Sequence, residues 1–420
     1  MSYTALSLSQ TPPLSVPLRF LLTAPLFAAA AGVVVLLFPE ALLSRWTPAT
    51  LAATHLLTLG FLAMTMFGAL QQLLPVLAGS TIPRASLFSA TVHLLLTAGT
   101  VALTSGMGFG SGVLMQLGTL LLWAAVILFA SVISYALLRA RSAHATVWAM
   151  GSALLSLIVA VSLGGGLLIY HGWRAPLAHP YTDLHLMWGM IGWVAVLIIG
   201  VAWQVVPMFQ LTPDYPRQMR RWLVPLLLSG LIVWSVARIG FDAGNSLFVV
   251  VIAALLAFAA TTLWLQQRRR RRLPDVTLSF WRVAMVSLMA AMVLLLLPGD
   301  HALLIGVVLI VGFAMSAVNG MLYKIVPFLI WLHLNNRLQQ SGLWLGNVPN
   351  MRQIIAEVAL RRHYRMHLLV LAMLLVAVLW PTAMARAAGA ALAISALLLE
   401  WNLLQGVRVY RRVVRDASAA

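Results

Sequence analysis

The sequence predicts an all-α membrane protein whose twelve transmembrane helices form three four-helix repeats with pseudo-threefold symmetry. Composition, twelve long apolar stretches and a segment that occurs three times support this prediction. Of the 420 residues, 62% are hydrophobic and only 9% are charged, whereas soluble domains carry roughly 25% charged residues. The mean hydropathy is +0.97. These values exclude an ordinary soluble domain and predict a polytopic membrane protein in contact with the lipid bilayer.

Each of the twelve apolar stretches is long enough to cross ~30 Å of hydrocarbon as a helix that rises about 1.5 Å per residue. They occupy residues 17–38, 50–78, 86–106, 112–138, 146–170, 184–209, 220–240, 246–266, 279–298, 302–334, 366–384 and 387–407. Residues 1–16 are largely polar and lack the basic start of a signal peptide, so we expect a short cytoplasmic tail there. Residues 17–420 are expected to form a single membrane domain.

A pattern of glycine, aromatic residue, glycine and proline recurs at identical offsets in the second, sixth and tenth stretches. The copies are Gly60-Phe61, Gly68 and Pro75; Gly192-Trp193, Gly200 and Pro207; and Gly312-Phe313, Gly320 and Pro327. Matched copies indicate an internally repeated protein, with units at about 17–141, 142–272 and 273–412. On a helix the glycines and proline form one stripe of small residues, which lets a neighbouring backbone approach closely.

A polar residue stands three positions before each of these prolines, and the three residues are Gln72, Gln204 and Lys324. Lys324 is the only lysine of the chain, and Glu400 is the only carboxylate well inside a helix in the expected cytoplasmic half. A charge within the bilayer costs roughly 2.5–3.5 kcal/mol. We therefore expect Lys324 and Glu400 to form an ion pair. Such a pair also supports an alternative function, a small-solute or ion transporter that couples through these two residues.

Arginines are concentrated in the loops that follow even-numbered helices. The chain has 27 basic and nine acidic residues, which gives a net charge of +18. The bias toward one side predicts that both termini and the loop 335–364 are cytoplasmic. The run Arg268–Arg272 is interpreted as a contact with anionic lipid and not with nucleic acid. Within 335–364, the segment MRQIIAEVALRRHYRM is expected to lie at the membrane surface with His363 facing water.

Histidines are the best candidates for chemistry, because the chain has no cysteine and therefore no thiolate site. His55, His185 and His301 lie near the expected outer ends of the three equivalent helices. On a helical wheel His185 falls on the glycine stripe and His55 nearly opposite it, while His301 is expected to lie too far out. A histidine inside the bilayer needs a partner, which is either a metal or haem iron, or a hydrogen bond to another helix.

Three segments carry a resemblance to a known family. They are THLLTLGFLAMTMFGALQQLLPVLAG from Thr54, DLHLMWGMIGWVAVLIIGVAWQVVPMF from Asp183 and NGMLYKIVPFLIWLH from Asn319. With twelve helices and histidines on the second and sixth, the chain resembles subunit I of the haem-copper oxidase superfamily. It looks most like the divergent branch that includes the NnrS-like membrane proteins of nitric oxide metabolism.

The resemblance implies haem as cofactor, with copper as a further candidate, in a bacterial inner membrane. His55 corresponds to the haem ligand on the second helix, and His185 to the histidine of the sixth. The seventh stretch has no histidine, nor has the tenth between His301 and His333, so an oxygen-reducing centre is not expected. The implied role is nitric oxide or respiratory-stress handling, or a non-pumping redox module, with a diatomic gas or a redox protein as partner. An interaction subunit without cofactor is a third alternative.

The arginine bias generates a first prediction. Reporter fusions after Ala420 and within residues 335–364 should both report a cytoplasmic location, since translocating the flanking arginines is unfavourable. A periplasmic signal from either fusion would overturn the orientation.

Overall fold

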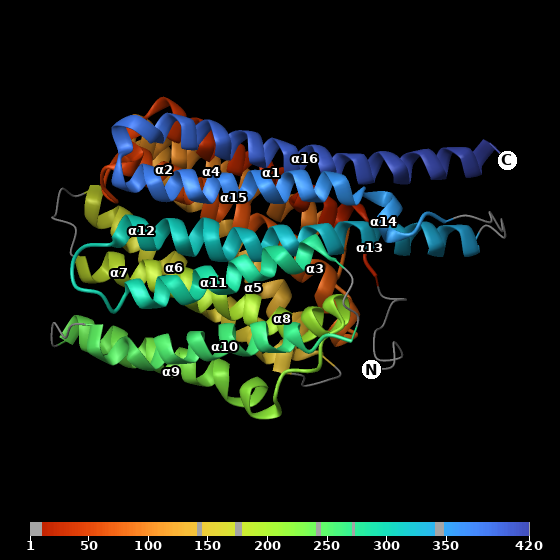
Figure 1. Cartoon of the computed structure of the whole chain (residues 1–420), viewed down its shortest axis with the longest axis horizontal. Coiled ribbons are helices and arrows are strands. Elements are labelled where there is room, and N and C mark those ends of the chain that lie inside the picture. The colour runs from red at the N-terminus through yellow and green to blue at the C-terminus, as the bar shows by residue number, and fades with distance from the viewer. Residues whose placement is uncertain are drawn as a thin grey trace.

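The computed structural model describes residues 11–140, 145–172, 179–240, 245–270, 274–340 and 348–419. Within these ranges, twelve helices are long and apolar enough to cross a membrane. The all-α fold with twelve spans is thus confirmed, and the helices run side by side along the long axis of the molecule (Figure 1). Residues 1–10 of the expected tail lie outside the described ranges, and the first helix begins at Ser15.

Nine of the spans are single helices, and the second, sixth and tenth are each built from three consecutive segments. The first four spans comprise α1 (Ser15–Leu37); α2 (Pro48–His55), η4 (Leu56–Ala63) and α3 (Met64–Ala78); α4 (Ala85–Phe109); and α5 (Gly112–Leu138). The next four comprise α6 (Ala145–Gly172); α7 (His179–Met187), η5 (Trp188–Ala195) and α8 (Val196–Gln210); α9 (Arg217–Gly240); and α10 (Val249–Gln267). The last four comprise α11 (Val276–Leu294); α12 (Ala302–Val307), η7 (Val308–Met315) and α13 (Ser316–Gln340); α15 (Glu357–Leu379); and α16 (Pro381–Ala419). Short helices η3 (Pro39–Leu42), η6 (Asn245–Phe248) and α14 (Met351–Ile354) lie between spans.

The middle segments η4, η5 and η7 are π-helices of eight residues each. Gly60, Gly192 and Gly312, the first glycines of the three motif copies, are each the fifth residue of their segment. A π-helix is rare and usually only a single turn long. The same departure from α-helix at the same motif position shows that the three copies specify one local structure.

The glycine stripe of each repeated span packs against the helix that precedes it in the chain. The neighbours that a Cβ would meet are Phe27 and Phe20 of α1 for Gly60 and Gly68; Ser156 and Ala149 of α6 for Gly192 and Gly200; and Ser287 and Trp281 of α11 for Gly312 and Gly320. In each helix the two neighbours lie six or seven residues apart, which is about two turns. The glycines of all three copies therefore make room for side chains of the preceding helix, and close packing against that helix is confirmed.

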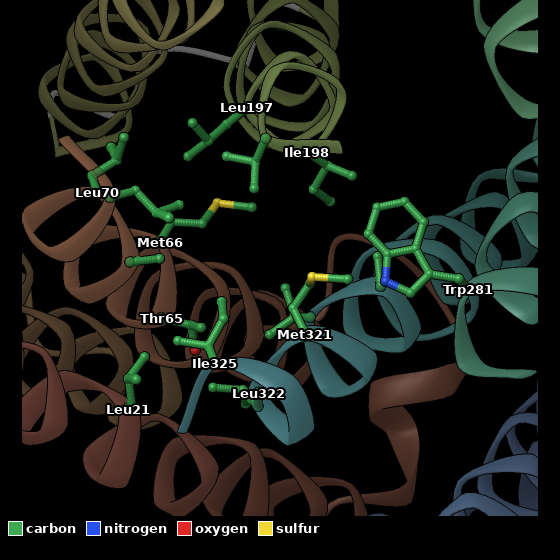
Figure 2. A pocket seen from close by; sticks show the side chains of 15 residues that line it. Leu21, Thr65, Met66, Leu70, Leu197, Ile198, Trp281, Met321, Leu322 and Ile325 are labelled. Carbon is green, nitrogen blue, oxygen red and sulfur yellow. The ribbon is translucent and has the colours of Figure 1, made fainter. Parts of the chain in front are cut away.

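Segments α3, α8 and α13 surround a small cavity of about 60 Å³ at the centre of the bundle. Figure 2 shows Met66, Leu197 and Met321, one from each segment, around this space. Thr65 contributes a hydroxyl, and the other lining side chains are apolar, including Trp281. The centre is therefore a packing void and not a candidate site for a polar ligand or a metal.

The segment expected at the membrane surface is largely part of a span. Helix α15 begins at Glu357, so MRQIIAEVALRRHYRM continues into the bilayer and does not lie along its surface. His363 is 1% exposed, and the expectation that it faces water is wrong. The physical reason is that its face of α15 packs against other helices: its ring lies 5.6 Å from the rings of both Phe280 in α11 and Tyr323 in α13.

A second prediction concerns the glycine stripe. Gly200→Ala should destabilise the protein by about 1–3 kcal/mol, because its Cβ would collide with the Cβ of Ala149. The matched control is Gly166→Ala, since a Cβ at Gly166 meets nothing within 4 Å. Thermal unfolding in detergent measures both variants. Equal unfolding temperatures for the two would contradict the assigned contact.

Candidate functional site

A cavity of about 1210 Å³ lies at the end of the bundle where α2, α7 and α12 begin, which is the expected outer end. Its walls come mainly from α2, α5, α6, α7 and α12 and are mostly apolar. The polar side chains that line it include His55, His185, His301, Arg45 and Asp183. Histidines from three equivalent spans therefore reach one cavity.

His55 and His185 face each other across this cavity. Their ring centres are 6.2 Å apart and their planes differ by 21°. His55 Nδ1–H donates to the carbonyl of Leu51 at 2.8 Å, and His185 Nδ1–H donates to the carbonyl of Ala160 at 2.8 Å. A carbonyl only accepts, so each Nδ1 carries the proton and each Nε2 keeps its lone pair. Both rings are thus prepared to ligate a metal through Nε2.

The difference in helical phase predicted from the wheel explains how the two rings meet. His185 lies against α6, the helix that the glycine stripe of its own span contacts, with its Cε1 2.8 Å from where a Cβ of Gly164 would stand. His55, on the other face of its span, points to His185 instead of α1. His55 therefore lies on the face of its span opposite the glycine stripe, and His185 lies on the stripe face of its own span. The two rings meet beside α6.

The ring centres of His55 and His185 are close enough for one cofactor to contact both rings. Among the described residues there is no group of three or more His, Cys, Asp or Glu that could enclose a metal ion. A porphyrin would supply the remaining ligands to its iron, and His55 and His185 would be the residues that hold it. The two imidazoles and the mostly apolar walls therefore fit haem.

An ion-pair network lies beside the histidines. Asp183 accepts from Arg45 at 3.0 Å and lies 3.5 Å from Arg238. Arg45 and Asp183 line the cavity, and so does a second carboxylate, Asp300. Arg45 and Arg238 are among the few arginines outside the loops that follow even-numbered helices, so the sequence carries a signal for this cluster.

His301 lies at the mouth of the cavity and not in the membrane core. Its Nε2–H donates to the carbonyl of Pro298 in its own loop at 3.0 Å, in an exposed position. The expectation that it lies far out agrees with this exposure. Even so, it contributes to the cavity lining, and it is a natural control for the buried pair.

The predicted ion pair between Lys324 and Glu400 is wrong. Lys324 Nζ donates instead to Asp275 Oδ2 at 2.9 Å. Asp275 also caps the start of α11 by accepting from the backbone N–H of Thr277. Lys324 lies 13 residues before the end of its span but level with that cap. Glu400 is buried, and its Oε2 has no hydrogen-bond partner among the described residues. The transporter alternative therefore loses its proposed coupling pair.

The pKa of Asp275 is lowered from its ordinary value. Burial acts in the opposite direction, but the charge of Lys324 and hydrogen bonds from Lys324 and Thr277 outweigh it. The ionised carboxylate is therefore the form that the fold stabilises.

Gln72 and Gln204, which occupy the motif position of Lys324, belong neither to the histidine cavity nor to the Lys324–Asp275 pair. Gln72 is buried, with its Oε1 lacking a partner, and Gln204 is half-buried. Neither lines the histidine cavity. The three polar residues before the prolines thus share a position in the motif without sharing a partner.

Comparison of the chain with protein-family models and with curated proteins gave no match. The function proposed below therefore depends on the geometry of the cavity.

A third prediction follows from the Lys324–Asp275 pair. Lys324→Met should destabilise the protein by on the order of 1 kcal/mol, and adding Glu400→Leu should change stability additively within about 0.5 kcal/mol. Because the pKa of Asp275 is lower in the folded state, the contribution of the pair is present above the unfolded value of about 3.9 and is lost as the pH falls through the lower folded value.

Thermal unfolding between pH 7 and the acid limit of detergent stability tests this prediction. At pH 7 the wild type should unfold at a higher temperature than Lys324→Met, and this difference should disappear only at the acid end of the range. If the effects of Lys324→Met and Glu400→Leu on stability are strongly non-additive in the double variant, the two residues interact and the rejected ion pair would be restored.

Proposed function

We propose that the chain is a haem-binding protein of the bacterial inner membrane, related to haem-copper oxidase subunit I, in which His55 and His185 bind one haem and the protein acts as a non-pumping redox module. The observation that supports this most is the pair of neutral imidazoles at the wall of the 1210 Å³ cavity, with ring centres 6.2 Å apart. Iron held by two imidazoles exchanges single electrons without needing an open coordination position.

The chain positions the two ligands in different ways. The carbonyl of Leu51 holds His55 from within the same span, whereas the carbonyl of Ala160 holds His185 from another helix. Such partners fix the tautomer and ring orientation and make the Nε2 lone pair a better donor.

Other cofactor chemistry fits this cavity less well. Copper bound here would have two imidazoles and no third His, Cys, Asp or Glu ligand among the described residues. A role in nitric oxide or respiratory-stress handling requires a free coordination position, so one histidine would have to leave when the gas binds. The geometry supports electron transfer to or from a redox partner more directly than gas binding.

A fourth prediction tests the haem site. Protein purified with haem available should show a Soret band whose position indicates two nitrogen ligands. His55→Ala and His185→Ala should each abolish or shift that band, and His301→Ala should leave it unchanged, since His301 bonds its own loop. A colourless wild-type protein under these conditions would reject the proposal.

Two neighbouring glycines provide a sharper comparison. Gly164→Ala should shift or weaken the band because its Cβ would press on the ring of His185, whereas Gly166→Ala meets nothing within 4 Å and should not. Should both variants keep the wild-type spectrum while His55→Ala loses it, His185 is not a ligand.

A further inference from the structure

Two basic segments that are far apart in the sequence meet at the expected cytoplasmic end of the bundle, away from the histidine cavity. One lies at the start of α9 and the other follows the end of α10, and these two helices pack side by side (Figure 1). Their described arginines are Arg217, Arg220 and Arg221 in the first segment and Arg268, Arg269 and Arg270 in the second. The sequence indicates a lipid contact for the second segment, and the structure brings the first segment beside it.

Hydrogen bonds hold the residues before α9 against the end of α10. The carbonyl of Leu211 accepts from the backbone N–H of Arg270 at 2.9 Å. Two further bonds join buried side chains, Tyr215 with Thr262 at 2.9 Å and Gln210 with Gln266 at 3.0 Å. The two basic segments therefore extend from one fixed framework, although about 50 positions separate them in the chain.

An exposed tryptophan marks the membrane interface on each of the two helices. Trp222 is 59% exposed and lies on the same face of α9 as the exposed Leu226 and Val233. Trp264 is 43% exposed and lies on the same face of α10 as the exposed Ala260. Tryptophan is enriched at the level of the lipid headgroups. Both indoles are therefore expected at this level, at the cytoplasmic ends of faces that contact lipid.

An arginine is stacked on each of these indoles. The Cζ atom of Arg221 lies 5.0 Å from the ring centre of Trp222, and that of Arg268 lies 4.0 Å from the ring centre of Trp264. A guanidinium over an aromatic face still offers N–H donors in its own plane. The tryptophans thus hold one guanidinium on each helix at the depth of the headgroups.

The charges at this surface favour an anion. The N-terminus of a helix carries partial positive charge, so cations in its first turns are unfavourable. Arg217 is nevertheless the first residue of α9, and the first turn has no acidic residue. Residues 210–222 and 262–270 contain six arginines and a single carboxylate, the exposed Asp214. A bound anion would therefore stabilise both the arginines and the helix terminus.

We propose that this surface binds one phospholipid with two phosphate groups, of the cardiolipin type, from the cytoplasmic leaflet. Arg221 and Arg268 each donate to one phosphate, since a guanidinium matches phosphate with two parallel hydrogen bonds. Basic surfaces between membrane helices on the cytoplasmic side suit such headgroups. The acyl chains lie against the exposed apolar faces of α9 and α10 next to the two indoles, which a soluble polyanion would not contact. The site is independent of haem binding by His55 and His185.

The experiment uses the full chain, delipidated in detergent, and measures lipid binding by native mass spectrometry. One cardiolipin should bind per chain, more tightly than phosphatidylglycerol, which has one phosphate. Arg221→Gln and Arg268→Gln should each weaken cardiolipin binding by roughly fivefold, the factor that one arginine near the surface contributes. Arg408→Gln is the matched control, because it removes an equal charge that is stacked on Trp401 of α16. It should bind cardiolipin as the wild type does.

Thermal unfolding gives a second readout that separates binding from folding. Cardiolipin should raise the unfolding temperature of the wild type and of Arg408→Gln more than that of the Arg221→Gln, Arg268→Gln double variant. Equal losses of binding in Arg408→Gln and Arg221→Gln would indicate attraction to net charge alone and would overturn the site. Phosphatidylglycerol bound as tightly as cardiolipin would overturn the assignment of two phosphates. Displacement of cardiolipin by inorganic phosphate or by a short oligonucleotide would overturn the assignment of a lipid.

Discussion

The architecture depends on close packing between each repeated span and the helix before it. Glycine at two levels in each span removes the side chains that would hold the helices apart, and the preceding helix supplies Phe20 and Phe27, Ala149 and Ser156, or Trp281 and Ser287 at those levels. In a bilayer, where lipid is as apolar as leucine, this close packing replaces the hydrophobic driving force of soluble proteins. It brings α3, α8 and α13 together around a small apolar centre and leaves the larger cavity to one side.

The buried imidazoles illustrate a second constraint, which is that polar groups inside lipid need partners. His55 and His185 both line the cavity and each uses a carbonyl for one nitrogen. On α15, His367 shares a hydrogen bond with Ser316, while Nδ1 of His363 has no partner among the described residues.

Much of the fold could be predicted because its signals are local. Apolar length gave the spans, and matched glycines gave the close contacts; the wheel phases of His55 and His185 agree with how the rings meet. The errors concern partners from distant segments. Lys324 pairs with Asp275, which stands just outside a predicted span and therefore did not count as a membrane residue. His363 follows two arginines, and nothing in that local sequence reveals that one face of α15 is enclosed by α11, α13 and α16.

A π-helix separates the end of each repeated span that carries or adjoins a histidine from the rest of that span. A π-helical turn holds one residue more than an α-helical turn, so each repeated span contains chain length that a straight α-helix would not need. Deleting one residue within η4 would let an α-helix re-form while His55 keeps its direction relative to Gly68 and Pro75, because the wide turn already absorbs that residue. Forcing the same residues into an α-helix without a deletion would instead turn His55 by about 100°. The direction of the imidazole thus depends on the wide turn being kept as long as its extra residue is present.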